Sequence, residues 1–425
     1  MKVLVLAQGG KAHAIIWKLS QSHAVSKIFC TYNNPVIKDI AESIDIRDNE
    51  TEKLVEFIKT NEINLTVVES DAAVNSGIAD ILRTEDIPVF GSGVNFARLE
   101  KSCNWAKKFF HKFKIPTAHF ATFDKEAQAL DYARKAKYPL VVKFDTRSAS
   151  SGTIICETFT EAQNAISYCL KNLYKPIVIE DFIIGKHVTY HVITDGYNAL
   201  PLSNAQVYKK SEDGNAGVIT EGMGAYAPVS FLDQSLEERI AHQIFFPMID
   251  GFNSEKLVFS GVLKANIVID EKNNPYLVGV NVSFGDPEAQ TILPLLENDL
   301  FAVMYSTSIG ALADDFEFLN LSDDHSVCVV VASSGYPGKT KKGDVIEGLD
   351  EIVDDNIFVF HSCTEKNIYR ETITTGGRIL SVVAIGSTLH KATENAYETV
   401  ELIDFKGKKY RKDIAKQRVI DEVKK

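Results

Sequence analysis

Short apolar runs alternate with amphipathic stretches along the first hundred residues, and this alternation constrains the fold most strongly. Runs rich in Val, Ile and Leu are typical of parallel strands buried on both faces, and the stretches between them have helical periodicity. The runs occupy residues 3–6, 27–30, 65–68 and 88–90, and the helical stretches occupy 12–21, 49–60 and 74–83. The pattern predicts a doubly wound α/β domain that binds a ligand at the carboxyl ends of its strands.

The loop after the first run is glycine-rich, with the sequence QGGKAHA at residues 8–14. It lacks the G-x-G-x-x-G spacing with which a strand-to-helix turn binds the pyrophosphate of a dinucleotide. A nicotinamide cofactor is therefore not expected.

Two further sections follow. A basic amphipathic helix at 101–113 leads into strands at 138–144 and 176–182, with a helix at 160–173 between them. A small α+β section then has strands at 327–331, 357–360 and 379–384 and a terminal helix at 388–402. We predict a multidomain chain of α/β and α+β class, divided into 1–100, 101–325 and 326–425.

Composition narrows the possible partners. The net charge of −11 over 425 residues argues against a nucleic-acid surface, which needs a basic stripe. The six cysteines include no C-x-x-C pair, so neither a disulfide framework nor a zinc site is expected. No apolar run approaches the roughly 20 residues that span a bilayer, and the first residues reach a glycine turn before a signal-peptide core could form. We expect a cytoplasmic protein that binds small molecules and no membrane.

The segment at 279–290, GVNVSFGDPEAQ, joins a predicted strand at 275–278 to a predicted helix. Asp286 is expected to cap this helix, with Pro287 at its first position and Glu288 in its first turn, where the helix dipole favours an anion. With GMGAYAP at 222–228, the segment resembles the signature of the phosphoribosylamine–glycine ligases, an ATP-grasp family of purine synthesis. Further motifs in family order are GGKAHA at 9–14, GYPG at 335–338 and GGR at 376–378.

The resemblance implies both an architecture and a reaction. It implies an ATP-grasp body at 101–325, with a lid at about 120–190, and a small C-terminal cap domain at 326–425. The implied enzyme joins glycine, or a similar amino acid, to phosphoribosylamine, or a similar amine, through an acyl phosphate, and converts ATP to ADP with Mg²⁺ or Mn²⁺. It would act as a monomer or homodimer.

Family positions carry over to this chain residue by residue. The residues implied to bind ATP are Lys107, Lys143, Gly152 and Glu180. The residue implied to bind Mg²⁺ is Asn281. The residues implied to bind substrate are Gly9, Gly10, Lys11, His13, Lys209, Gly222, Met223, Gly224, Asp286 and Arg378.

The chain departs from the family at several of these sites. Gly279 stands where the family has its magnesium glutamate, and Ser283 stands where it has an arginine facing the developing acyl phosphate. Removing such a cation lowers rates by on the order of 10²- to 10⁵-fold. Other departures are Cys103 for an ATP-contacting lysine, Lys186 and His187 for the acidic pair at the ribose, a flap at 147–151 without its glycines and lysine, and altered substrate loops at 207–208 and 218–221. The pattern predicts weakened binding of ATP and of the metal.

Two classes of function fit these observations. The first is a ligase, either phosphoribosylamine–glycine ligase itself or an ATP-grasp ligase with a changed substrate. The second is a catalytically impaired homologue that acts as a binding or regulatory module. A carboxylase of the ATP-grasp type fits the motifs at 222–228 and 284–290 less well. We take the ligase as the leading hypothesis, because a carboxylate from elsewhere in the chain could replace the one missing at Gly279.

Overall fold

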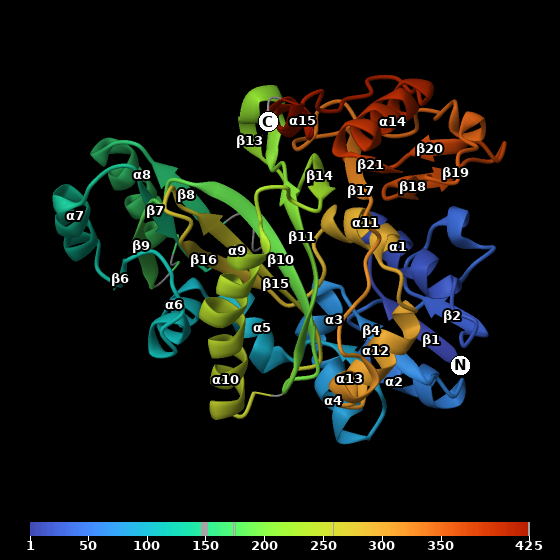
Figure 1. Ribbon diagram of the computed structural model, residues 1–425, viewed down its shortest axis with the longest axis horizontal. Helices are drawn as coiled ribbons and strands as arrows, with labels where there is room; N and C mark the ends of the chain where they lie inside the picture. The colour runs from blue at the N-terminus through green and yellow to red at the C-terminus, as the bar shows by residue number, and fades with distance from the viewer. Residues whose placement is uncertain (146–151, 173, 175, 258, 424–425) are drawn as a thin grey trace.

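The computed structural model describes residues 1–145, 152–172, 174, 176–257 and 259–423. It has a mixed α/β architecture with a five-stranded, a four-stranded and an eight-stranded sheet and two small hairpins (Figure 1). The multidomain fold class predicted from the sequence is confirmed. Within the described ranges, we find no helix whose length and apolarity would let it cross a membrane.

The N-terminal sheet is parallel, with strand order β3-β2-β1-β4-β5. Its strands are β1 (Lys2–Leu6), β2 (Lys27–Cys30), β3 (Glu42–Ser43), β4 (Leu65–Val68) and β5 (Val89–Gly91). Its helices are α1 (Gly9–Ser20), α2 (Thr51–Thr60), α3 (Asp71–Ser76) and α4 (Ile78–Thr84). The single helix predicted at 74–83 is wrong, because Gly77 adopts φ +78° and ends α3 in the left-handed conformation that glycine favours.

The four-stranded sheet has strand order β6-β9-β7-β8 and lies at the left of Figure 1. Its elements are β6 (Phe120–Phe123), α7 (Glu126–Lys135), β7 (Leu140–Lys143), β8 (Thr153–Cys156), α8 (Phe159–Lys171) and β9 (Ile177–Asp181). Helices α7 and α8 pack on it around an apolar cluster that includes Ala129, Val142 and Ile166. This sheet therefore has a core of its own.

The eight-stranded sheet has strand order β16-β15-β10-β11-β14-β17-β21-β18. Its strands are β10 (Lys186–Thr194), β11 (Ala199–Val207), β14 (Gly224–Ala227), β15 (Gly261–Ile269), β16 (Pro275–Asn281), β17 (His325–Ala332), β18 (Ile357–His361) and β21 (Arg378–Gly386). Strand β14 pairs with β11 on one side and with β17 on the other. The strands after residue 325 thus continue the sheet of the central section, and the division at 100 and 325 stays a prediction.

The remaining elements surround this sheet. The helices are α5 (Val94–Lys101), α6 (Cys103–Lys112), α9 (Gln234–Ile240), α10 (Phe246–Ser254), α11 (Glu288–Ile292), α12 (Leu300–Ser308), α13 (Leu312–Asp315), α14 (Leu389–Leu402) and α15 (Lys416–Val423). The hairpins are β12 (Lys210–Glu212) with β13 (Ala216–Ile219), and β19 (Thr364–Lys366) with β20 (Thr372–Thr374). Helix α11 contacts α1 of the N-terminal section and β11, β14 and β17 of the sheet. It therefore lies where the sections meet.

The predicted cap at Asp286 is wrong, because Pro287 is the N-cap residue, whereas Glu288 lies in the first turn of the helix as predicted. Strand β16 extends to Asn281, and α11 begins at Glu288. The Asp286 carboxylate accepts hydrogen bonds from Gln290 Nε2 at 2.7 Å and Arg378 Nη1 at 2.9 Å. Strand β21 brings Arg378 against this turn, so the Asp286 carboxylate binds side chains. It does not cap helix α11.

Candidate active site

Three of the predicted ATP-binding side chains meet in one cluster. Lys107 comes from α6, Lys143 from the end of β7 and Glu180 from β9. Glu180 Oε2 lies 2.5 Å from Lys107 Nζ, and Glu180 Oε1 lies 2.6 Å from Lys143 Nζ. The side chains are almost fully buried, with exposed fractions of 2%, 10% and 3% for Lys107, Lys143 and Glu180. We call these three residues the Glu180 cluster.

The charges of this cluster stabilise the ionised carboxylate. Burial raises the pKa of Glu180, but the charges of Lys143 and Lys107 outweigh burial and hold the pKa below its ordinary value. Two lysines face one carboxylate, so one positive charge remains uncompensated. Such a cluster is suited to attract the phosphates of a nucleotide.

The Glu180 cluster is also bound to the central sheet. Lys143 Nζ donates to the carbonyl of Val278 at 2.8 Å, where β15 and β16 pair irregularly. Gly152 is buried, and its carbonyl accepts a hydrogen bond from the Phe144 backbone at 3.0 Å. The predicted flap at 147–151 lies outside the described residues. The four-stranded sheet and β16 thus meet at Lys143.

Asn281, the predicted metal ligand, contacts an acidic and an amide side chain. Its Nδ2 donates to Glu100 Oε1 at 2.6 Å, and its Oδ1 accepts from Asn266 Nδ2 at 3.0 Å. A Cβ built on Gly279 would lie 3.7 Å from Asn266 Nδ2, an ordinary contact distance. A side chain at position 279 would therefore point towards Asn266, as Asn281 does, and its Cβ would fit without a clash.

These side chains meet a minimal requirement for Mg²⁺. The ion prefers hard oxygen ligands and is usually held by one or two carboxylates together with waters and substrate phosphates. Glu100 provides one carboxylate, and Asn266 and Asn281 provide amide oxygens. Within the described ranges, no group of three His, Cys, Asp or Glu side chains is arranged to hold a metal alone. The donor set therefore fits an ion whose coordination is completed by waters and substrate phosphate.

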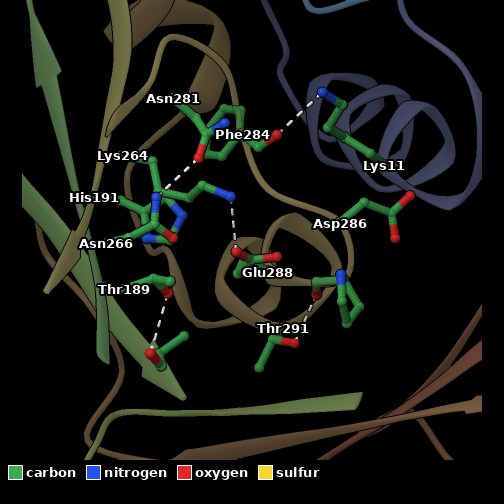
Figure 2. Close-up of polar contacts among 12 residues, drawn as sticks. Lys11, Thr189, His191, Lys264, Asn266, Asn281, Phe284, Asp286, Glu288 and Thr291 are labelled. Carbon is green, nitrogen blue, oxygen red and sulfur yellow. Dashed lines mark hydrogen bonds and ion pairs between the residues drawn. The ribbon is translucent and has the colours of Figure 1, made fainter. Parts of the chain in front are cut away.

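A second buried carboxylate, Glu288, lies against Lys264, which is the strand partner of Asn281 (Figure 2). Glu288 Oε1 of α11 lies 3.0 Å from Lys264 Nζ of β15. Burial raises the pKa of Glu288, but the charges of Lys264, His191 and Lys209 outweigh it and bring the pKa to about 2. Burial lowers the pKa of His191 to about 4, so its imidazole is neutral at pH 7. We call Glu288, Lys264, Lys209 and His191 the Glu288 cluster.

Several predicted substrate-binding residues converge on Asp286. A Cβ on Gly9, which has φ +70°, would lie 3.8 Å from Asp286 Oδ2. Gly222 packs against the same turn, since a Cβ there would lie 2.6 Å from Pro287 Cδ. Burial lowers the pKa of Arg378, but Asp286, Tyr336 and Glu221 together outweigh burial and raise the pKa above its ordinary value. Elements from all three sections therefore meet at this turn.

Lys11 binds the same segment from the N-terminal section. Its Nζ donates to the carbonyls of Glu69 at 2.7 Å and Phe284 at 3.0 Å (Figure 2). Glu69 Oε2 in turn accepts from the Phe284 backbone N–H at 2.8 Å. Lys11 and Glu69 thereby fix the 281–286 segment against the N-terminal sheet.

Other predicted substrate residues lie in the packed interior. His13 Nδ1 accepts from the His361 backbone N–H at 3.0 Å, and burial lowers the pKa of His13 to about 4. Met223 is fully buried between β11 and β17. Gly10 and Gly224 allow close packing, because a Cβ there would lie 2.6 Å from Gln290 Nε2 and from the Cys328 carbonyl, respectively. Direct substrate contact by these four residues stays a prediction.

The N-terminal sheet has a cavity at the carboxyl ends of its strands, where a ligand was predicted. Its volume is about 350 Å³, and Gln8, Thr31 and Asp48 line it. Gln8 Nε2 donates to Asp48 Oδ2 at 3.2 Å. Ligand binding there stays a prediction.

The sequence interpretation missed five residues of the candidate site: Glu100, His191, Lys264, Asn266 and Glu288. Glu100 contacts Asn281 across 181 positions of the chain. Lys264 and Asn266 lie within an apolar run, GVLKANIVI at 261–269, and polar residues two positions apart in such a run are a usable signal of one functional strand face. No local signal marks Glu100.

The fold and site together define the ATP-grasp class: a four-stranded sheet and a larger central sheet enclose a buried Lys-Glu-Lys cluster. Three family profiles match in order: "Phosphoribosylglycinamide synthetase, N domain" at 1–100, "ATP-grasp (A) domain" at 101–289 and "C domain" at 326–417. The chain belongs to the phosphoribosylglycinamide synthetase family.

Individual relatives agree with this assignment. The chain is 37% identical over 420 residues to phosphoribosylamine–glycine ligase of Caldanaerobacter subterraneus subsp. tengcongensis, covering 98% of this chain and 99% of the relative. It is 37% identical over 422 residues to the ligase of Neisseria meningitidis serogroup B, covering 98% and 99%. The crystal structure of the Thermotoga maritima ligase superposes with a TM-score of 0.84 at 26% identity, covering 98% of this chain and 100% of that one.

Proposed function

We propose that the chain is a phosphoribosylamine–glycine ligase of purine biosynthesis. A carboxylate oxygen of glycine attacks the γ-phosphorus of ATP, the bond to ADP breaks, and glycyl phosphate forms. The amine nitrogen of phosphoribosylamine then attacks the carbonyl carbon, phosphate leaves, and the nitrogen loses a proton. The observation that carries the proposal is the full-length match to ligases, combined with the Glu180 cluster.

The chain's own residues supply three parts of this reaction. In the Glu180 cluster, Lys107 and Lys143 attract and orient the ATP phosphates. Glu100, Asn266 and Asn281 would hold Mg²⁺, which neutralises phosphate charge when it is bound. The turn around Asp286, together with Gly9, Gly222 and Arg378, positions the amine substrate.

We propose that ATP and the metal bind more weakly than in a site with a second carboxylate. Gly279 contributes no oxygen ligand, and both Oδ1 and Nδ2 of the Asn281 amide already bind neighbouring side chains. We further propose a cytoplasmic protein that acts as a monomer or homodimer on small molecules.

Release of ADP by the purified protein tests the proposal. ADP should form when phosphoribosylamine, glycine and Mg-ATP are all present, and omission of any one should stop it. The amide product, phosphoribosylglycinamide, should form in an amount equal to that of ADP. ADP release that needs a different acid or amine would show a changed substrate, and its absence under all conditions would support a binding or regulatory module.

A further inference from the structure

Glu221 lies in the loop between β13 and β14, and its side chain reaches strand β21. Its Oε2 accepts a hydrogen bond at 3.0 Å from Nη2 of Arg378, which is 157 positions away in the chain. In the eight-stranded sheet, β17 separates β14 from β21 (Figure 1). The contact therefore bridges the central section and the strands after residue 325, at the Asp286 turn that Arg378 also binds.

The two terminal nitrogens of Arg378 differ in their surroundings. Nη1 donates to Asp286 Oδ1 at 2.9 Å and to the Asp286 carbonyl at 3.2 Å. The side chains of Arg378 and Asp286 are mostly buried, with exposed fractions of 14% and 19%, whereas the side chain of Glu221 is 64% exposed. Asp286 therefore fixes the guanidinium from the protein side, and Glu221 covers Nη2 from the solvent side.

The backbone around Glu221 is fixed, although its side chain is exposed. The Thr220 N–H donates to the Lys209 carbonyl at 2.7 Å, and Thr220 Oγ1 accepts from the Gly222 N–H at 3.1 Å. Gly222 packs against Pro287, since a Cβ there would lie 2.6 Å from the proline Cδ. Release of the guanidinium therefore requires a rotation of the Glu221 side chain and no movement of the loop.

The charges at the turn oppose a second anion until Glu221 moves. Asp286 and Glu221 both bind Arg378, so two carboxylates share one guanidinium and leave an excess of one negative charge. Tyr336 and Cys363 also lie beside Arg378, but burial raises the pKa of each, and both are neutral at pH 7. With Glu221 turned to solvent, the charges of Asp286 and Arg378 balance, and Nη2 can donate to a new acceptor.

Helix α1 begins on the other side of the same carboxylate. A Cβ on Gly9, the first residue of α1, would lie 3.8 Å from Asp286 Oδ2, while Arg378 binds Oδ1. The side chain of the N-cap residue Gln8 binds Asp48 at 3.2 Å, so it leaves the first N–H groups of α1 uncapped. The amino end of a helix and the fork of an arginine both favour phosphate groups. The turn is therefore suited to a phosphate that displaces Glu221.

We propose that Glu221 is a latch on Arg378, which covers Nη2 in the absence of ligand and is displaced by the phosphate group of the amine substrate. A ligand must bind Nη2 more strongly than this carboxylate does, so Glu221 favours a doubly charged phosphate monoester over weaker anions. The identity of the ligand as phosphoribosylamine rests on the proposed function. The latch itself rests on the geometry of the contact between Glu221 and Arg378.

Calorimetry with ribose 5-phosphate, which carries the phosphate of the amine substrate but no amine, tests the latch. Glu221→Gln should tighten binding about fivefold, because it removes a competing exposed ion pair. Acetate should compete with ribose 5-phosphate more effectively in this variant than in the wild type. Glu212→Gln, on the exposed side of β12, removes the same charge without touching Arg378 and should bind as the wild type does.

A double-mutant cycle separates the contact from a general effect of charge. Arg378→Met should weaken binding of ribose 5-phosphate by about tenfold or more, and Glu221→Gln should then have no further effect. Glu221→Gln changes an exposed side chain conservatively, so its result does not depend on the folding of Arg378→Met. In turnover, Glu221→Gln should lower the KM for phosphoribosylamine and leave the KM for ATP within about twofold.

Ribose 5-phosphate binding that Glu221→Gln leaves unchanged or weakens would overturn the inference, and so would the absence of binding to both proteins. Acetate that competes equally well in both would remove the selection for phosphate. Protein that binds ribose 5-phosphate more tightly after Glu221→Gln but releases no ADP would contradict the proposed function alone. The two failures are thereby distinguishable.

Discussion

The Glu180 and Glu288 clusters each combine one carboxylate with two lysines, but they differ in how far the lysines are exposed to solvent. Each places a buried carboxylate near two lysines. Glu180 contacts both of its lysines at 2.5 and 2.6 Å, and all three side chains are buried. Glu288 contacts Lys264 at 3.0 Å, while Lys209 remains partly exposed. Phosphates must therefore compete with Glu180 for its lysines, whereas an anion can approach Lys209 directly.

Lys143→Ala should have the largest effect, because it removes a cation that contacts both Glu180 and β16. We expect kcat/KM for ATP to fall by on the order of 10²- to 10³-fold, and calorimetry should show at least tenfold weaker binding of Mg-ATP. Lys135→Ala, at the end of helix α7 on the same four-stranded sheet, is the control, because its side chain is 74% exposed. Tight Mg-ATP binding untouched by Lys143→Ala would show that the Glu180 cluster is a structural ion pair only.

The double substitution Gly279→Glu/Ser283→Arg tests whether turnover is limited by the two family charges that this chain lacks. The space beside Gly279 accepts a side chain, and the pair adds a metal carboxylate and a cation. We expect turnover to rise by about 10- to 100-fold. Substantial wild-type turnover that the double substitution lowers would show that this chain has rebuilt its own catalytic site.

Glu100→Gln should have a smaller effect, confined to the dependence of turnover on Mg²⁺. The change removes a charge beside Asn281 but keeps an oxygen, so we expect about tenfold more Mg²⁺ to be needed for half-maximal turnover. An unaltered Mg²⁺ dependence would remove Glu100 from the proposed metal site.

Acid should destabilise the fold through its buried histidines, among them His13 and His191 of the Glu288 cluster, and His13 gives the smallest expected effect that can be tested alone. The pKa of His13 is lowered from 6.5 to about 4. The unfolded state therefore binds the proton first, and stability is lost as pH falls from about 6.5 towards 4. We expect the free energy of unfolding to drop by about 1–2 kcal/mol between pH 7 and pH 5 from this group, by denaturant titration. His13→Asn should reduce the drop; an unchanged pH dependence would contradict the assignment.

The fold was largely predictable, because each element depends on a local pattern. Buried strands such as β2 and β4 were located at their observed bounds from apolar runs alone. The helix cap at Asp286 was wrong because Arg378, 92 positions away, binds that carboxylate. The prediction of a single helix at 74–83 was wrong, because the positive φ of Gly77 separates α3 from α4.

The candidate site was predictable only where a motif marks it. The motif positions grouped Lys107, Lys143 and Glu180, and the structure joins these side chains by direct contacts, while their binding of ATP stays a prediction. Glu100 and Lys264 lie outside any motif. Their roles depend on which strands and helices become neighbours, and no local pattern encodes that information.

The sequence by itself determined the family, the order of the elements and the absence of a carboxylate at Gly279, because these properties belong to residues and their local patterns. Only the tertiary structure decided which charges meet. It places Glu100 beside Asn281 and Lys264 beside Glu288, and it joins the strands after residue 325 to the central sheet through β14. Electrostatic interactions act through distances of a few ångströms in space, and those distances exist only once the chain has folded.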